Sequence, residues 1–301
     1  MKPTLLACAL LGLVIPSQSN STEAAEPIDF QPDTAFVKLP DSITLGACSG
    51  VAVNSKGNVY LFHRGKKPII CLDPHGTFVR AWGDDTIATA HGLRIDSDDN
   101  VWVTDIGNHQ VIKFSPAGKL LLALGKAGSP GDGIDEFNKP TDVAFGPQGE
   151  IYVSDGYGNN RIIKFTPNGG FLAQWGEAGD GPGQLNLPHS IIVDQNGRIV
   201  VGDRENDRVQ VFESSGKLVA VWSGFAPYGL AFDRQGHLFV ADGRANKVLQ
   251  LDKQGKIVRT WGEEGAQPGE FQLPHMLAAD AFGNLYVGEI KGVRFQRLIR
   301  K

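Results

Sequence analysis

Short apolar stretches alternate with polar turns along almost the whole chain, and this alternation recurs as a unit. Each unit has an apolar strand, a polar turn that often ends in Gly-Asn, and a second strand that usually ends in Asp. Val, Ile, Tyr, Phe and Trp dominate the strand positions, while Gly, Asn and Asp dominate the turns, as is typical of β-structure. Six copies align without gaps across the turn: SGVAVNSKGNVYLFH from Ser49, HGLRIDSDDNVWVTD from His91, TDVAFGPQGEIYVSD from Thr141, HSIIVDQNGRIVVGD from His189, YGLAFDRQGHLFVAD from Tyr228 and HMLAADAFGNLYVGE from His275.

Most copies continue with a third strand (VIKF, IIKF, VQVF or VLQL) and a fourth strand that ends near a tryptophan. Four strands in roughly 40–50 residues is the period of a β-propeller blade. The last copy has only three strands, and an extended-looking segment at residues 30–39 precedes the first copy. We therefore predict an all-β, six-bladed β-propeller of four-stranded antiparallel blades, with the ring closed by an N-terminal strand that leaves no open sheet edge.

The first position of the repeat is histidine in every second copy, at His91, His189 and His275. Alternate blades of a six-bladed ring stand about 120° apart, so these three imidazoles should meet near the axis. Three neutral imidazoles with an open fourth position are typical of a catalytic zinc site, although iron or another ion that accepts imidazole would also fit. The competing interpretation is that each is simply a hydrogen-bonded histidine at a strand end.

Three residues that follow the second strand of their copies should lie on the same face of the disc as the histidines. Arg64 and Arg204 occupy the first and fourth copies, opposite each other across the ring, and Tyr157 follows the second strand of the third copy. Arginine suits a carboxylate, and a nearby cation together with two guanidinium groups would favour the phenolate of Tyr157, which makes it a candidate base. Surface ion pairs for the arginines and simple packing for the tyrosine remain the alternatives.

The beginning of the chain, MKPTLLACALLGLVIPSQS, has the features of a secretory signal. We predict a signal peptide at residues 1–25 and a single propeller domain at residues 26–301, with the mature protein outside the cytoplasm. The apolar run is too short to span a bilayer, so no membrane insertion is expected. The net charge of −4 and the scattered Lys and Arg argue against nucleic acid as a partner. We also expect a monomer.

Two cysteines of the predicted propeller, Cys48 and Cys71, fall on the first and third strands of one blade. With a strand between them they would be about 9.6 Å apart, which is too far for a disulfide. We predict two free, buried thiols. The Asp that ends most second strands recurs in nearly every copy, and repetition favours a structural role in capping the turn.

The unit resembles the NHL repeat, whose Asn-His-Leu run reads Asn108-His109-Gln110 here. Several segments resemble the peptidyl-α-hydroxyglycine α-amidating lyase family more specifically: FHRG from Phe62, NHQVIKF from Asn108, KPTDVAFGPQGEIYVSDGYGNNRIIKF from Lys139, LPHSIIV from Leu187, GDRENDRVQVF from Gly202 and LPHMLAAD from Leu273. The resemblance implies a six-bladed propeller, zinc on the three histidines, a catalytic tyrosine at Tyr157 and active-site arginines at Arg64 and Arg204.

The resemblance also implies an activity and a second metal. The activity is cleavage of an N-acyl or peptidyl α-hydroxyglycine, a small-molecule or peptide substrate with a free carboxylate, to an amide and glyoxylate. The second metal is a structural calcium held partly by backbone carbonyls matching Val51 and Leu93. Met276 stands where the family has the acidic calcium ligand, and a thioether is a poor ligand for calcium, which puts that site in doubt. Gly158 replaces a family cysteine, so that disulfide is absent.

Two other classes of function compete with a lyase. A non-enzymatic NHL-repeat propeller would bind a protein or peptide across its face and would carry no zinc. A propeller hydrolase acting on lactones or esters would hold calcium with Asp, Glu and Asn in the channel. The first positions of the six copies include no acidic residue, which disfavours the hydrolase.

Overall fold

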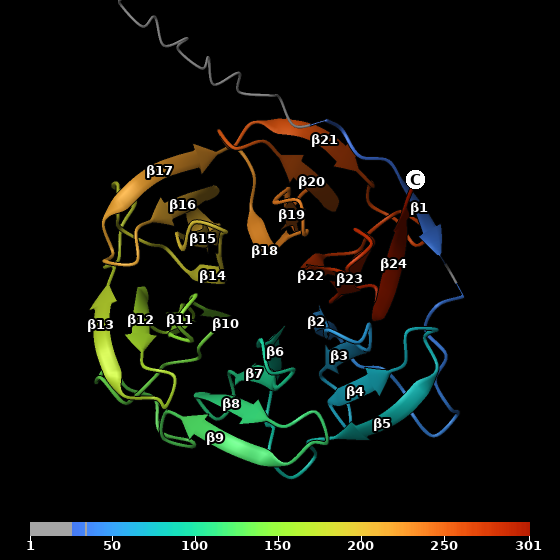
Figure 1. Ribbon diagram of the computed structural model, residues 1–301, viewed down its shortest axis with the longest axis horizontal. Coiled ribbons are helices and arrows are strands. Elements are labelled where there is room, and N and C mark those ends of the chain that lie inside the picture. The colour runs from blue at the N-terminus through green and yellow to red at the C-terminus, as the bar shows by residue number, and fades with distance from the viewer. Residues whose placement is uncertain (1–25, 34) are drawn as a thin grey trace, which may run out of the picture.

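A computed structural model of the protein describes residues 26–33 and 35–301, so the predicted signal peptide at residues 1–25 lies outside the described residues. The described residues form six four-stranded antiparallel sheets arranged as blades around a central axis (Figure 1). The prediction of an all-β, six-bladed propeller is confirmed. In the same part of the chain, no helix is both long and apolar enough to cross a membrane.

In blades 1 to 5 the strands run outward from the axis in chain order, and in blade 6 the first strand of the chain, β1, is outermost. Blade 1 contains β2–β5, blade 2 β6–β9, blade 3 β10–β13, blade 4 β14–β17, blade 5 β18–β21, and blade 6 β22–β24 with β1. The strands are Phe30–Asp33 (β1), Cys48–Val53 (β2), Val59–His63 (β3), Ile69–Leu72 (β4), Phe78–Trp82 (β5), Ala90–Ile95 (β6), Val101–Asp105 (β7), Gln110–Phe114 (β8), Leu120–Leu124 (β9), Asp142–Phe145 (β10), Ile151–Asp155 (β11), Arg161–Phe165 (β12), Phe171–Trp175 (β13), Pro188–Val193 (β14), Ile199–Asp203 (β15), Arg208–Phe212 (β16), Leu218–Ser223 (β17), Pro227–Phe232 (β18), Leu238–Asp242 (β19), Lys247–Leu251 (β20), Ile257–Trp261 (β21), Pro274–Ala279 (β22), Leu285–Glu289 (β23) and Arg294–Arg300 (β24).

The ring closes through strands from opposite ends of the described chain. β1 pairs antiparallel with β24, with Phe30 opposite Arg300 and Asp33 opposite Arg297. An ion pair between Asp33 and Arg297 adds to the ladder. In Figure 1 the blue β1 lies along the outer edge of the red blade 6. The predicted closing strand is confirmed, although it is shorter than the segment at residues 30–39 from which it was predicted.

Burial in each blade decreases outward from the axis. All five residues of β11 are buried, whereas β17, at the rim of blade 4, alternates between partly buried and exposed residues. Tryptophans near the ends of outer strands pack between blades. Trp82 meets Tyr60 of its own blade and Phe114 of blade 2 in edge-on contacts with ring centroids 6.4 and 6.2 Å apart. Such contacts give blade 1 an apolar interface with blade 2.

The aspartates that end second strands cap the preceding loop. Asp155 accepts a hydrogen bond from the backbone N–H of Asn138 at 2.8 Å and pairs with Arg161 at 3.0 Å. In blade 1 the equivalent residue is His63, whose Nδ1 accepts the backbone N–H of Gly46 at 3.0 Å. The structural role predicted for this position is confirmed.

Cys48 and Cys71 are buried and free, as predicted. Cys48 opens β2 and Cys71 lies in β4, so the strand β3 separates them. Burial raises the pKa of the Cys71 thiol, which keeps it protonated and unreactive.

Candidate active site

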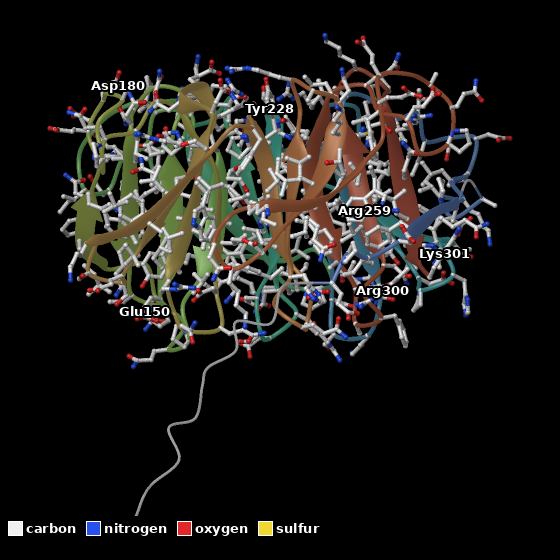
Figure 2. The ribbon with its side chains drawn as sticks, turned by 90° about the horizontal axis from the view of Figure 1, so that it is seen from above. Glu150, Asp180, Tyr228, Arg259, Arg300 and Lys301 are labelled. Carbon is white, nitrogen blue, oxygen red and sulfur yellow. The ribbon has the colours of Figure 1, made fainter. Side chains whose placement is uncertain are left out.

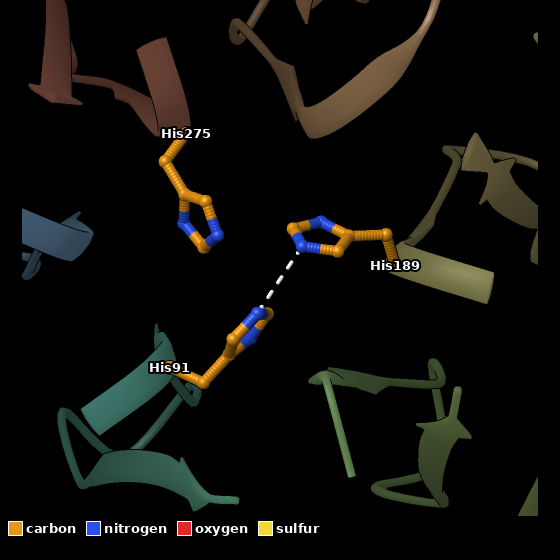
Figure 3. A group of neighbouring side chains, drawn as sticks. All are labelled: His91, His189 and His275. Atoms are coloured by element: carbon orange, nitrogen blue, oxygen red, sulfur yellow. Dashed lines mark hydrogen bonds between the residues drawn. The ribbon is translucent and has the colours of Figure 1, made fainter. Parts of the chain in front are cut away.

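Three histidines from alternate blades meet at the axis. His91 lies in β6, His189 in β14 and His275 in β22, and all three are buried. Figure 3 shows the three imidazoles converging from three separate inner strands. One nitrogen of each ring lies within 4.8 Å of the others, and the Nε2 atoms of His91 and His189 are 3.1 Å apart. The structure thus brings the three predicted ligands together.

The backbone of the next blade fixes the orientation of each imidazole. The Nδ1 atom of His91 lies 2.6 Å from the carbonyl oxygen of Thr141. His189 and His275 make the same contact at the same distance, to the carbonyl oxygens of Tyr228 and Ser49 respectively. A carbonyl oxygen can only accept, so Nδ1 carries the proton in each ring and the lone pair of Nε2 faces the axis.

The surroundings keep these rings uncharged. Burial is the main cause that lowers the pKa of all three imidazoles, and it brings that of His275 to about 3. The guanidinium groups of Arg64 and Arg204 lower the pKa of His91 and His275 further, because they disfavour a nearby positive charge. All three rings are therefore neutral at neutral pH, which is the form that binds a metal ion.

The geometry fits a divalent cation. Two Nε2 lone pairs that face each other at 3.1 Å repel unless a positive charge lies between them. In a tetrahedral zinc site with bonds of about 2.0–2.1 Å, neighbouring ligand nitrogens are about 3.3 Å apart. The residues present can thus hold an ion that accepts three imidazoles.

The hydroxyl of Tyr157 closes one side of this group. Its oxygen lies 3.2 Å from Nε2 of His91 and 3.3 Å from Nε2 of His189. Arg204 reaches the same oxygen with Nη1 at 3.5 Å. The guanidinium carbon of Arg204 also stands 5.5 Å from the centre of the Tyr157 ring and 4.7 Å from that of Tyr228, so the side chain is held between two aromatic faces.

Arg64 approaches the group from the opposite side of the ring. Its Nε donates a hydrogen bond of 3.1 Å to the carbonyl oxygen of Ala90, the residue before His91. The side chain is exposed, whereas that of Arg204 is only 12% exposed. The structure therefore places both predicted arginines next to the histidines, one of them free to turn toward solvent.

Three residues near the site had no role in the sequence interpretation. Tyr228 lies at the same face of the disc as Asp180, opposite Glu150 (Figure 2). Glu205 pairs with Arg204 at 2.7 Å and also contacts Arg244. Both Glu205 and Arg244 occupy the repeat position that Tyr157 occupies in blade 3, and Tyr228 occupies the histidine position of blade 5. These repeat positions were the signal that could have found them.

Comparison with known proteins finds NHL repeats and several relatives that match part of the chain. The family model described as NHL repeat matches residues 88–114, 137–165 and 185–212. A Caenorhabditis elegans protein named probable peptidyl-α-hydroxyglycine α-amidating lyase is 42% identical over 99 residues, which cover 32% of this chain and 28% of that protein. The chain is a propeller that contains NHL repeats and is similar, over about a third of its length, to a protein named as an amidating lyase.

Other relatives share shorter parts of their length. Mouse peptidyl-glycine α-amidating monooxygenase is 46% identical over 103 residues, 32% of this chain and 10% of that protein. Human NHL repeat-containing protein 3 is 38% identical over 111 residues, 35% of this chain and 31% of that protein. The aligned region thus spans about a tenth of the mouse relative and less than a third of the other two.

Solved structures share the propeller architecture of this chain. A streptogramin B lyase structure superposes with a TM-score of 0.67 over 94% of this chain and 100% of that one, at 18% sequence identity. At this identity the likeness shows the fold alone.

The calcium expected from the amidating lyase family does not fit the residues present. Val51 and Leu93 are buried on the inner strands β2 and β6, but Met276 on β22 offers only a thioether. The residue after Leu93 is Arg94, whose guanidinium forms an ion pair of 2.6 Å with the buried carboxylate of Asp142. A cationic side chain beside a calcium ion would repel it.

Proposed function

We propose that this propeller is a metal-dependent lyase that cleaves the C–N bond of N-acyl or peptidyl α-hydroxyglycine to an amide and glyoxylate. The observation that carries the proposal is the position of the Tyr157 hydroxyl, 3.2 and 3.3 Å from two neutral imidazoles that are oriented to bind one cation. The relationship to the amidating lyases supports the same reaction.

The reaction needs one proton to move from oxygen to nitrogen. The substrate carries a hydroxyl and an amide nitrogen on the same carbon, next to a carboxylate. Tyr157 accepts the proton of that hydroxyl, the oxygen forms the C=O bond of glyoxylate, and the C–N bond breaks. The amide nitrogen takes the electron pair of that bond together with the proton returned by Tyr157, so atoms and charge balance without any other reactant.

The three histidines would hold the metal ion, for which we propose zinc. When bound, the ion supplies Lewis-acid polarisation of a substrate oxygen. Three neutral nitrogen ligands and one open direction are the typical arrangement of a catalytic zinc site. The carbonyls of Thr141, Tyr228 and Ser49 keep the ligand nitrogens aimed at the axis throughout.

The arginines would bind the carboxylate and offset negative charge in the transition state. Arg204 is held between Tyr157 and Tyr228 and is already paired with Glu205, so it presents a fixed guanidinium edge near the hydroxyl. Arg64 is exposed, and among the described residues it is tethered through Nε, so its other nitrogens can close on the substrate. We further propose that the protein acts as a monomer outside the cytoplasm.

The test is a product assay on the purified protein. A synthetic peptide that ends in α-hydroxyglycine is incubated with the protein, and glyoxylate and peptide amide are measured against the spontaneous rate without protein. We expect equal amounts of the two products, loss of turnover when the metal is stripped, and recovery when zinc is restored. A peptide-binding propeller without enzymatic activity would instead bind the peptide, release no glyoxylate above background and contain no stoichiometric metal.

A further inference from the structure

A second group of charged and polar side chains lies on the inner strands, directly next to the histidines. Arg94 follows His91 by three residues on β6. Asp142 opens β10 immediately after Thr141, and Ser190 follows His189 on β14. The group therefore joins blades 2, 3 and 4 at the wall of the central channel.

The guanidinium of Arg94 reaches across these blades. Its Nε donates to Oδ1 of Asp142 at 3.0 Å, and Nη2 donates to Oδ2 at 2.6 Å, which is a bidentate pair. Nη2 also lies 3.1 Å from Oγ of Ser190. Nη1 donates to the carbonyl oxygen of Leu230 in blade 5 at 3.1 Å. One side chain thus connects four of the six blades.

The carboxylate of Asp142 is equally well bound. Its Oδ2 accepts hydrogen bonds from Oγ of Ser190 and from the backbone N–H of Ile191, each at 3.0 Å. The Asp142 side chain is fully buried, and that of Arg94 is 14% exposed. A buried charge of either sign is costly without its partner, so the two residues depend on each other.

We propose that Arg94 is a built-in cation that takes the place of the calcium expected in this family, so that the propeller folds and holds its histidines without calcium. Arg94 and Asp142 supply a positive charge and a carboxylate to the channel wall, as a calcium ion and its acidic ligand would. Met276 stands after His275, where the family has its acidic calcium ligand. The carboxylate of this chain, Asp142, lies in blade 3 instead. The positive charge is covalently part of the chain and cannot be removed by a chelator.

The pair also supports the histidine site. The carbonyl of Thr141, which orients His91, belongs to the peptide unit that leads into Asp142. Oγ of Ser190 accepts the backbone N–H of Leu230 at 3.1 Å, which fixes β18 against β14 close to the contact between Tyr228 and His189. Arg94 therefore acts as a positioning residue for two of the three imidazoles.

The first experiment uses the unmodified protein. Its thermal unfolding midpoint is measured with zinc held constant and calcium raised from zero to millimolar, with magnesium in parallel, and calcium binding is measured by equilibrium dialysis. We expect an unchanged midpoint and no bound calcium. One calcium per chain together with a higher midpoint specific to calcium would overturn the proposal.

The second experiment is a double-mutant cycle with Arg94→Met, Asp142→Asn and both changes together. Each single change leaves an uncompensated partner, so we expect the midpoint to fall by roughly 5–15 °C in each single variant and by less than the sum in the double variant. Arg94→Lys keeps the charge but loses the bidentate geometry. Its unfolding midpoint should therefore lie between those of Arg94→Met and the unmodified protein. Additive losses would contradict the proposal.

A matched control separates a channel role from general stability. Arg161 and Asp155 form a similarly buried pair at 3.0 Å in blade 3, away from the channel wall. Arg161→Met should also lower the unfolding midpoint but leave the zinc dissociation constant unchanged. Arg94→Lys should weaken zinc binding by roughly tenfold, as expected for a group that orients metal ligands. Equal effects of Arg94→Lys and Arg161→Met on zinc binding would show that Arg94 is only a structural residue.

Discussion

The Nδ1 atom of His189 and the backbone carbonyl oxygen of Tyr228 lie 2.6 Å apart, although 39 residues separate them in the chain. The same contact joins His91 to Thr141 and His275 to Ser49. Blades with a histidine and blades without one therefore have different tasks. The first kind supplies an imidazole, and the second supplies the carbonyl that orients it. The three-histidine group therefore involves all six blades, although only three of them carry a histidine.

Replacing one histidine should remove the metal. Without His189, two imidazoles remain, and no other metal-binding side chain belongs to this group among the described residues. We expect the zinc content to fall from about one ion per chain in the unmodified protein to well below one in His189→Ala. Elemental analysis of protein purified without chelator gives the measurement. His75→Ala is the matched control, because His75 is an exposed turn residue and should keep the full metal content. Equal metal content in both variants would rule out the histidine site.

Tyr157→Phe should abolish turnover while keeping the metal. The change removes a hydroxyl that lies 3.2 Å from Nε2 of His91 and 3.3 Å from Nε2 of His189, and a general base contributes roughly 10²–10⁴-fold to rate. We expect kcat to fall by that factor with zinc content unchanged. Tyr286→Phe, which removes a hydroxyl bonded to Asp280 in blade 6, should leave kcat as it is. A Tyr157→Phe enzyme with normal kcat would exclude the base role.

Removing the Arg204 charge should weaken recognition of the substrate carboxylate. One charge-assisted hydrogen bond contributes about 1.5–3 kcal/mol, so Arg204→Met should lower kcat/KM by roughly 10–100-fold. Steady-state kinetics on an α-hydroxyglycine substrate with a free carboxylate, compared with the same substrate as its methyl ester, gives the measurement. The unmodified protein should prefer the free acid and Arg204→Met should not; an unchanged preference would show that this carboxylate is bound elsewhere.

The free energy of unfolding of the metal-free protein should decrease as the pH is lowered. Burial lowers the pKa of the three imidazoles in the folded protein, to about 3 for His275, whereas an unfolded histidine titrates near 6.5. Below about pH 6.5 the unfolded chain therefore binds more protons, and the free energy of unfolding decreases as pH falls toward 3, by about 1.4 kcal/mol per pH unit for each histidine. Urea unfolding of metal-free protein at several pH values measures the slope. His275→Gln should reduce this slope, and an identical slope would contradict the prediction.

The repeat made most of the fold predictable. A fixed position in six aligned copies gives an angular position in a ring, so the meeting of His91, His189 and His275 and the shared face of Arg64, Tyr157 and Arg204 followed from spacing alone. The closing strand followed from the missing fourth strand of the last copy. The length of β1 did not, because only Phe30–Asp33 find a partner on β24.

Contacts between blades were not predictable in this way. Arg94 and Asp142 are 48 residues apart and occupy different positions of the repeat, so no single column of the alignment pairs them. The role of the Tyr228 carbonyl could not be predicted either, because every amino acid at that position has the same backbone oxygen. Glu205 and Arg244 interact only because neighbouring blades bring their loops together.

The pairing of β1 with β24 has a consequence for the blade that holds the third imidazole. His275 stands on β22, the inner strand of the blade that this pairing completes. The two strands that complete the blade of His275 therefore come from opposite ends of the described chain, while His91 and His189 lie in blades built from continuous segments.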